Sequence, residues 1–192
     1  MSFAGCTWLN PPSKWSLDNA CLQAMTDPAT DFWRETHYGF TRDSGHFFGS
    51  PVAGDFTAQL RVRAKYEALY DQAGIMIRID DRQWVKAGLE NSDGENRLSS
   101  VLTIGQSDWA PGAYNYDPFS FWIRATVSGG ALRLQISSDG RRWPVFRLAP
   151  FPMAATYLVG PMCCTPERAG LEVKFSDFQL EPPLGKDLHD LS

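Results

Sequence analysis

Hydrophobic and polar residues alternate along most of this chain, and the alternation is clearest over residues 70–79 and 83–90. The apolar members are Ala73, Ile75, Ile77 and Ile79 in the first stretch and Val85, Ala87 and Leu89 in the second. Successive side chains of a strand point to opposite faces, so each stretch predicts a strand that buries one face. The polar residues Asp80, Asp81 and Arg82 between them predict a tight turn. The two strands are therefore expected to pair at the centre of the fold.

The same alternation leaves a polar set on the opposite face of this strand pair. Its members are Gln72, Arg78, Trp84, Lys86 and Glu90. This mixture of amide, charge and indole is typical of a sheet face that binds a ligand. The alternative is an exposed face stabilised by cross-strand pairs such as Lys86–Glu90 or Arg78–Glu90.

Alternating segments recur along the rest of the chain, at residues 21–25, 56–64, 119–127, 132–137 and 171–180. Turn residues separate them every 8–12 residues, which predicts about ten to thirteen short strands and an all-β fold, an antiparallel β-sandwich of the jelly-roll type. Prolines and polar residues predict irregular structure over residues 5–18 and a long loop over residues 106–117. We expect one domain, residues 1–183, followed by a mobile tail, residues 184–192.

Composition narrows the class of protein. The chain has 192 residues, of which 43% are hydrophobic, enough for one core. Its formal net charge is −4 and it has no basic run, which argues against nucleic-acid binding. The absence of a long apolar stretch argues against a membrane partner, and the first residues lack the charge and apolar run of a signal peptide. We therefore expect a cytoplasmic protein.

The four cysteines lack the paired spacing of a zinc site. Cys163 and Cys164 are adjacent, and the simplest interpretation is two strand residues that face opposite sides, with one in the core. The alternative is a redox-sensing pair of neighbouring thiols.

Several motifs occur in an order that resembles a known family. They are Thr30-Asp31-Phe32-Trp33-Arg34, His37-Tyr38-Gly39-Phe40, Gly45-His46-Phe47-Phe48, Gly54-Asp55-Phe56, Tyr70-Asp71-Gln72-Ala73-Gly74, Trp84-Val85-Lys86, Glu90, Ser107-Asp108-Trp109, Ser138-Asp139-Gly140 and Met162-Cys163. Together they resemble DUF1349, the uncharacterised family that contains the yeast regulation-of-enolase protein. The resemblance implies a concanavalin A-like lectin/glucanase fold, in which two curved sheets pack together and the concave sheet holds the ligand. It implies little about function, and fold analogy with lectins is associational.

A carbohydrate-binding groove follows if the polar face is the concave one. Trp rings stack on sugar C–H surfaces, while Arg, Lys, Gln and Glu hydrogen-bond to hydroxyls. Trp122 and Arg124 are expected to join this face because Phe121, Ile123 and Ala125 form the better core set. The predicted ligand-binding residues are Arg34, His37, Gln72, Arg78, Trp84, Lys86, Glu90, Trp122 and Arg124.

Candidates for chemistry are Glu90, His37 and His46. The two histidines could converge across a turn and act as acid or base, or bind a divalent ion with a carboxylate. Spacing fixes no third ligand, so we predict no metal and no cofactor. Glycoside hydrolysis needs two flanking carboxylates, and the Glu-x-Asp-x-x-Glu motif of glucanases with this fold is absent. Asp71 or Asp108 would have to partner Glu90.

Three functions remain open from the sequence. The first is a non-enzymatic protein that binds a carbohydrate or sugar-derived metabolite. The second is a carbohydrate-active hydrolase or lyase that uses Glu90 and a histidine as acid and base. The third is a protein-binding regulator of central metabolism. The ligand is not identified, and both a monomer and a homodimer are consistent with exposed strand edges.

Overall fold

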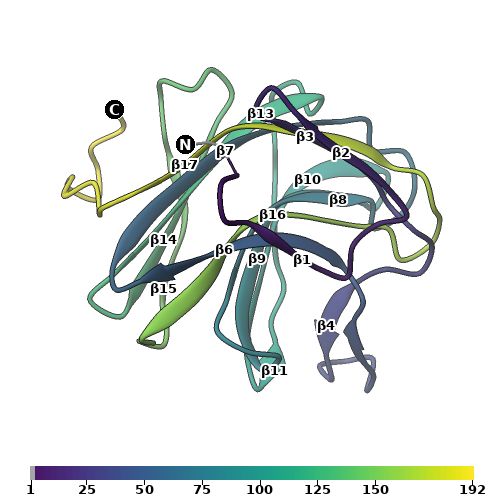
Figure 1. Ribbon diagram of the computed structural model, residues 1–192, viewed down its shortest axis with the longest axis horizontal. Helices are drawn as coiled ribbons and strands as arrows, with labels where there is room; N and C mark the ends of the chain where they lie inside the picture. The colour runs from purple at the N-terminus through teal and green to yellow at the C-terminus, as the bar shows by residue number, and fades with distance from the viewer. Residues whose placement is uncertain (1–2) are drawn as a thin grey trace.

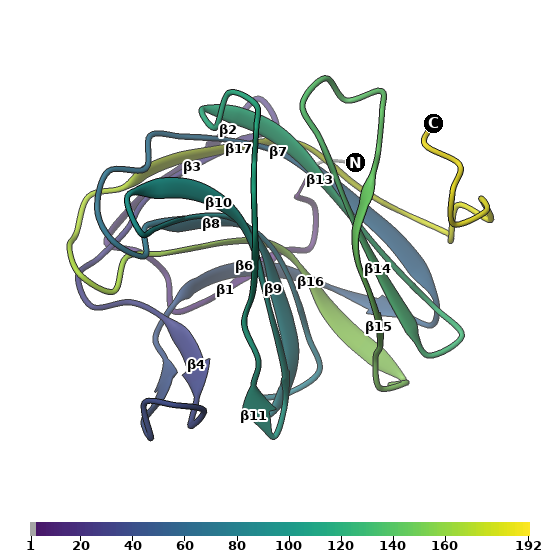
Figure 2. The same cartoon turned by 180° about the vertical axis from the view of Figure 1, so that it is seen from behind.

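Two large antiparallel sheets stack face to face in the computed structural model, which describes residues 3–192. The first sheet has the order β1-β6-β16-β8-β9-β10-β11, with β12 also paired to β10. The second sheet has the order β15-β14-β13-β7-β17-β3-β2, and β4 with β5 forms a separate hairpin. Figures 1 and 2 show the two layers from opposite sides. The predicted fold class, an antiparallel β-sandwich, is confirmed.

The strands of the first sheet are β1 (Thr7–Leu9), β6 (His46–Ala53), β8 (Gln72–Arg78), β9 (Gln83–Ser92), β10 (Glu95–Ile104), β11 (Gln106–Ser107), β12 (Ala110–Gly112) and β16 (Thr156–Cys164). Those of the second are β2 (Lys14–Asp18), β3 (Cys21–Met25), β7 (Phe56–Ala64), β13 (Ser120–Ser128), β14 (Ala131–Ser137), β15 (Val145–Pro150) and β17 (Glu172–Glu181). The hairpin consists of β4 (Phe32–Arg34) and β5 (Thr41–Asp43). None of the described residues forms a helix that is long and apolar enough to cross a membrane.

The main core lies between the two sheets and follows the predicted alternation. Ala73, Ile75 and Ile77 of β8 are buried in it together with Val85, Ala87 and Leu89 of β9. The facing layer comes from inward residues of β7, β13 and β14, which include Leu60, Val62, Phe121, Ile123, Ala125, Leu132 and Leu134. Burying these side chains is the main stabilisation of the sandwich.

Tight turns close two of the long hairpins. Asp93 and Gly94 join β9 to β10, and Gly129 and Gly130 join β13 to β14. All four have positive φ, between 55° and 78°. This is the backbone of the type I′ turn, which matches the twist of the flanking strands and favours Asp-Gly and Gly-Gly.

Two segments expected to be irregular contain strands. Residues 5–18 include β1, which pairs with β6, and β2, which pairs with β3. The prolines of this segment predicted a break in regular structure, and each of these edge strands is short and lies beside such a break, so the sequence pattern did not reveal them. Residues 106–117 include β11 and β12, both paired with β10. With these four strands and the β4–β5 hairpin, which alternation also did not predict, residues 3–192 contain 17 strands.

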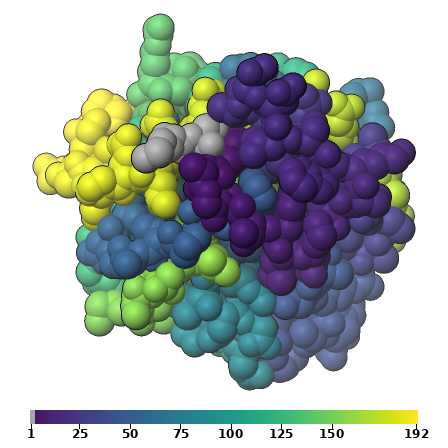
Figure 3. All heavy atoms as spheres, in the orientation of Figure 1, coloured from purple at the N-terminus to yellow at the C-terminus, as the bar shows by residue number. Residues whose placement is uncertain are grey.

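The C-terminal end of the described chain lies on the surface, whereas the Phe3 side chain at its start is buried in the main core. Figure 3 shows the N-terminal segment spread across one face and the C-terminal residues gathered at one side. The tail expected to be mobile, residues 184–192, folds back against the second sheet: Arg133 donates to the carbonyls of Lys186 and Asp187. Cys163 lies in the main core and Cys164 in a smaller cluster on the opposite face, as the simpler interpretation predicted; both thiols are free and buried.

Candidate functional site

The outer face of β8 and β9 carries the predicted polar set in three facing pairs. Gln72 lies opposite Glu90, and Arg78 lies opposite Trp84, while Lys86 lies opposite Met76. Gly74 and Gly88 face each other between them, and a Cβ on Gly88 would come within 2.0 Å of the carbonyl oxygen of Ala73. The glycines leave an open row in the sheet between Lys86 and Glu90. Figure 2 shows β8, β9 and β10 curving, with β4 on the inside of the curve.

The β4–β5 hairpin covers part of this face and buries two of the predicted ligand-binding residues. Trp84 is 1% exposed and packs against Phe32, with ring centroids 6.0 Å apart. Arg78 makes a two-point ion pair with Asp43 of β5, at 2.6 and 2.8 Å. Trp84 and Arg78 therefore hold the hairpin on the sheet, and neither lines the pocket described next. The alternation correctly predicted the face of the sheet on which these two residues lie, but it could not show that a hairpin would cover that face.

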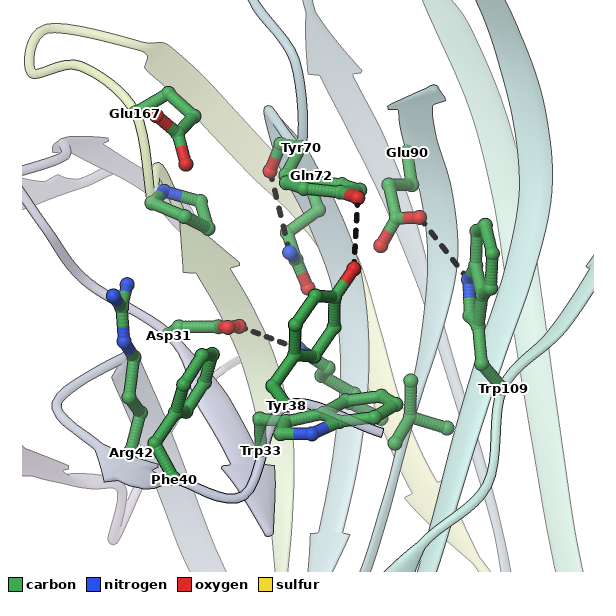
Figure 4. A pocket seen from close by; sticks show the side chains of 13 residues that line it. Asp31, Trp33, Tyr38, Phe40, Arg42, Tyr70, Gln72, Glu90, Trp109 and Glu167 are labelled. Atoms are coloured by element: carbon green, nitrogen blue, oxygen red, sulfur yellow. Dashed lines mark hydrogen bonds and ion pairs between the residues drawn. The ribbon is translucent and has the colours of Figure 1, made fainter. Parts of the chain in front are cut away.

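A pocket of about 170 Å³ opens between the hairpin, the sheet and the segment around Trp109. Its lining residues are Asp31, Trp33, Tyr38, Phe40, Arg42, Tyr70, Gln72, Lys86, Glu90, Val101, Trp109, Pro166 and Glu167. In Figure 4, Tyr38 and Trp109 stand on opposite sides of the space and the Glu90 carboxyl group points between them. The pocket thus has aromatic sides and a polar end.

The polar end is a buried group of charges. The Lys86 ammonium lies 2.8 Å from Oδ1 of Asp31, and their side chains are 4% and 14% exposed. Burial acts to lower the pKa of Lys86, but Asp31 and the other nearby acids outweigh it, so the pKa is raised and the ammonium stays charged. Burial raises the pKa of Glu90 to about 7, with Asp31 adding to the rise and Lys86 opposing it. Glu90 is therefore able to exchange a proton near neutral pH.

Hydrogen bonds fix the aromatic sides. The Trp109 indole N–H donates to Oε1 of Glu90 at 3.1 Å and also lies 3.2 Å from Ser99 Oγ. The hydroxyls of Tyr38 and Tyr70 are 3.2 Å apart, and this bond with burial raises the pKa of Tyr70 to about 12. Gln72 donates to the main-chain carbonyl of Tyr70 at 3.2 Å. These contacts hold three rings and one amide in place before any ligand arrives.

The hairpin loop that carries Tyr38 has a constrained backbone. Glu35, His37 and Gly39 all have positive φ. Main-chain bonds from Glu35 N–H to the Phe40 carbonyl and from Gly39 N–H to the Glu35 carbonyl, at 2.7 and 2.6 Å, close the loop. Non-glycine residues in this region are uncommon and cluster at ligand sites. The loop presents Tyr38 and Phe40, stacked at 5.3 Å, along one side of the pocket.

The two histidines do not come together. His46 is buried at the start of β6, where Nε2 accepts the Asp27 N–H at 3.0 Å and Nδ1 donates to the Asn10 carbonyl at 2.7 Å. His37 is exposed and contacts the Tyr38 ring. Neither lines the pocket, so the convergence that the sequence left open does not occur. Within residues 3–192 no three His, Cys, Asp or Glu side chains are grouped to hold a metal ion.

The remaining predicted residues lie elsewhere. Trp122 and Arg124 are on β13, in the second sheet, so they do not share a face with Glu90. Arg34 is buried and donates to the Gly105 carbonyl. The two acids considered as partners of Glu90 are both engaged: Asp71 pairs with Arg168 and Asp108 pairs with Arg147. The carboxylate near Glu90 is instead Asp31.

Of the predicted ligand-binding residues, Gln72, Lys86 and Glu90 do line the pocket. Most of the aromatic side of the pocket was not predicted from the sequence, above all Trp33, Phe40 and Tyr70. The available signal was the density of aromatic residues over residues 32–40, next to a turn. Strand alternation cannot identify such residues because they reach the site from a separate hairpin and from loops.

Comparisons with known proteins agree on the family. The family described as "Protein of unknown function (DUF1349)" matches residues 8–183. The chain is 59% identical over 186 residues to Regulation of enolase protein 1 of Saccharomyces cerevisiae, covering 97% of this chain and 94% of the relative.

Solved structures share the fold. A functionally unknown protein from Saccharomyces cerevisiae superposes with a TM-score of 0.95 and 56% identity, over 96% of this chain and 100% of that one. A mutant of the GH43 protein BlXynB from Bacillus licheniformis gives 0.68 and 16% identity, over 94% of this chain and 38% of that one. The second likeness extends to the sandwich alone. With its family match and its close yeast relative, the chain belongs to the DUF1349 family, whose function is unknown.

Proposed function

We propose that this protein binds a carbohydrate, or a metabolite derived from one, in the pocket between Tyr38 and Trp109. The observation that carries the proposal is the placement of these two rings on either side of a space that ends at Glu90 (Figure 4). Aromatic faces bind the C–H surfaces of sugar rings, and a fixed polar group at one end orients the hydroxyls.

The size of the pocket favours a small ligand. Its volume of about 170 Å³ is below the roughly 300–1,000 Å³ of pockets that enclose drug-sized ligands. A single sugar ring, free or at the end of a chain, is the unit we expect. The polar groups offer both kinds of hydrogen bond: Lys86 donates, Asp31 accepts, and Gln72 and Tyr38 do both.

The test is isothermal titration calorimetry with a panel of monosaccharides and oligosaccharides. Trp109→Ala removes one aromatic side and is expected to weaken binding at least about tenfold, the equivalent of 1.4 kcal/mol. Trp15→Ala is the matched control, since Trp15 is 47% exposed against 42% for Trp109 and lies outside the pocket. Equal affinities of the two variants would refute the assignment of the site.

A second candidate function is catalysis on a carbohydrate, and the raised pKa of Glu90, about 7, favours it. A buried carboxyl group that is partly protonated at neutral pH suits a general acid. Asp31, not a histidine, would be the second group. Turnover of any bound saccharide should disappear in Glu90→Gln while binding persists; turnover that survives this change would exclude the role.

A further inference from the structure

The outer face of the second sheet carries a group of cations that is separate from the pocket. Arg61 and Arg63 of β7, Arg124 of β13 and Arg133 of β14 all point away from the main core. None of these four arginines forms an ion pair with an Asp or Glu side chain of residues 3–192. We call these residues the arginine face. It is unusual in a chain whose net charge is −4.

Two tryptophans orient the arginine face. The Arg61 guanidinium lies 4.2 Å from the centre of the Trp122 ring, and the Arg124 guanidinium lies 3.8 Å from that of Trp143. Stacking restricts the planar guanidinium groups, so less entropy is lost when an acceptor binds. Burial and the like charge of Arg133 lower the pKa of Arg124 to about 10. An anion near Arg124 and Arg133 would relieve that repulsion.

A peptide segment already lies against this face. Arg133 donates to the carbonyls of Lys186 and Asp187 at 3.1 and 3.2 Å. The main-chain N–H of Trp143 donates to the Leu191 carbonyl at 2.9 Å, and Arg124 lies 3.5 Å from a main-chain oxygen of Ser192, the last residue. All these bonds are made to main-chain oxygens of the segment, so they depend little on its side chains. Figures 1 and 2 show the segment beside β14, at one side of the sandwich.

The segment does not fill the surface that it covers. A hollow of about 250 Å³ remains between it and β14, lined by Arg133, Leu148 and Leu188 among others. Leu148 is 57% exposed. Arg61 and Arg63, further along the sheet, make no hydrogen bond with the segment. The arginine face therefore keeps donors at Arg61 and Arg63 that the segment does not use, and an apolar hollow lies beside Arg133.

We infer that the arginine face is a docking site for an extended acidic peptide of a partner protein, and that residues 184–192 occupy part of it in the partner's absence. Charge complementarity selects acidic residues, since no Asp or Glu side chain of the described residues forms an ion pair with any of the four guanidinium groups. The segment already present shows that extended main chain is accepted there. Its own Asp187 and Asp190 supply only two acids, beside Lys186.

The test measures fluorescence anisotropy with a labelled decapeptide. The probe has the sequence of residues 183–192 with its lysine and histidine replaced by glutamate. We expect it to bind the full chain, and to bind at least about tenfold more tightly once residues 184–192 are replaced by an equally long Gly/Ser segment. Unchanged affinity in that variant would show that the segment does not compete, and would overturn the inference.

Charge variants then locate the site. In the Gly/Ser background, Arg61→Gln with Arg133→Gln should weaken the probe at least about tenfold. Arg82→Gln with Arg97→Gln changes the net charge equally on the first sheet and should change the affinity less than about twofold. Melting temperatures confirm that both double variants fold; if the first does not, Arg133→Gln alone should still weaken binding. Similar losses in the two double variants would overturn the site.

A polyanion of another class is the alternative outcome. In the same anisotropy assay, a labelled single-stranded oligonucleotide should bind weakly. Replacing residues 184–192 by the Gly/Ser segment should not increase its affinity as it does for the acidic peptide. If the oligonucleotide binds the arginine face and the acidic peptide does not, the peptide inference is wrong. Saccharide binding at the Tyr38–Trp109 pocket is measured separately and does not depend on either result.

Discussion

The buried pair of Lys86 and Asp31 makes the most demanding prediction about the site. Asp31→Asn keeps the shape of the side chain but removes its charge, leaving an ammonium that is 4% exposed without its partner 2.8 Å away. Breaking a buried ion pair by removing one charge costs about 3–5 kcal/mol. The Asn oxygen still accepts a hydrogen bond and Glu90 still attracts Lys86, so we expect the lower end, about 3 kcal/mol.

The assay is urea denaturation at pH 7, checked by thermal unfolding. For a chain of this length 1 kcal/mol corresponds to about 2–4 °C, so Asp31→Asn should lower Tm by roughly 6–12 °C. Glu172→Gln is the control, since it removes the partner of Lys174 from an exposed pair 3.7 Å apart and should cost less than about 0.5 kcal/mol. A loss below about 1 kcal/mol in Asp31→Asn would refute the reasoning.

The same variant should change Glu90. Asp31 helps to raise the pKa of Glu90 to about 7, whereas Lys86 opposes the rise. Without Asp31 the repulsion disappears and Lys86 is left to interact with Glu90 alone. We expect the Glu90 carboxyl resonance in a ¹³C NMR titration to show a lower midpoint. An unchanged or higher midpoint would mean that the charges are not coupled as described.

Three further changes test other parts of the account. The pKa of Glu90 rises from 4.5 in the unfolded chain to about 7 in the folded protein, so the protonated side chain favours folding fully below pH 4.5 and this contribution, up to about 3 kcal/mol, is lost as the pH rises to 7. Glu90→Gln should therefore flatten the dependence of the unfolding free energy on pH between pH 4.5 and 7. An unaltered slope would contradict this. His46→Ala removes a buried ring and its two hydrogen bonds and should cost about 2 kcal/mol, whereas His37→Ala, at an exposed position, should cost less than about 0.5 kcal/mol. Equal costs would contradict this. Gly88→Ala places a Cβ 2.0 Å from the Ala73 carbonyl oxygen and should destabilise the fold by at least about 3 kcal/mol. In Gly112→Ala the nearest atom to the new Cβ is 3.9 Å away, so the cost should be less than about 1 kcal/mol. Urea denaturation measures both.

Alternation was a sufficient guide to the central strands. The inward set of β8 and β9 is the predicted one, because a single-residue change of register would have moved every apolar side chain out of the core. In the two large sheets, the strands that alternation missed are β1, β2, β11 and β12, which lie at or near sheet edges, are short, and bury few side chains. Their pairing depends on neighbours distant in sequence, which no local pattern records.

The site was predicted less completely than the fold. Periodicity placed Gln72, Lys86 and Glu90 on one face, and the pocket includes all three. It could not show that Phe32 would cover Trp84, or that Trp122 belongs to the other sheet. Both facts follow from how the chain folds back on itself, and alternation reports only which side of its own strand a residue occupies.

A ¹⁵N spectrum of the tryptophan indole N–H groups, recorded during titration with the saccharide panel, would decide whether the pocket between Tyr38 and Trp109 binds a saccharide. Trp109 lines the pocket and is assigned with Trp109→Phe, whereas Trp143 is buried against Arg124 on the second sheet. We predict that a saccharide shifts the Trp109 resonance in a saturable manner and leaves that of Trp143 in place. If no saccharide moves Trp109, or if the shifts are confined to tryptophans outside the pocket, the proposed carbohydrate site is wrong.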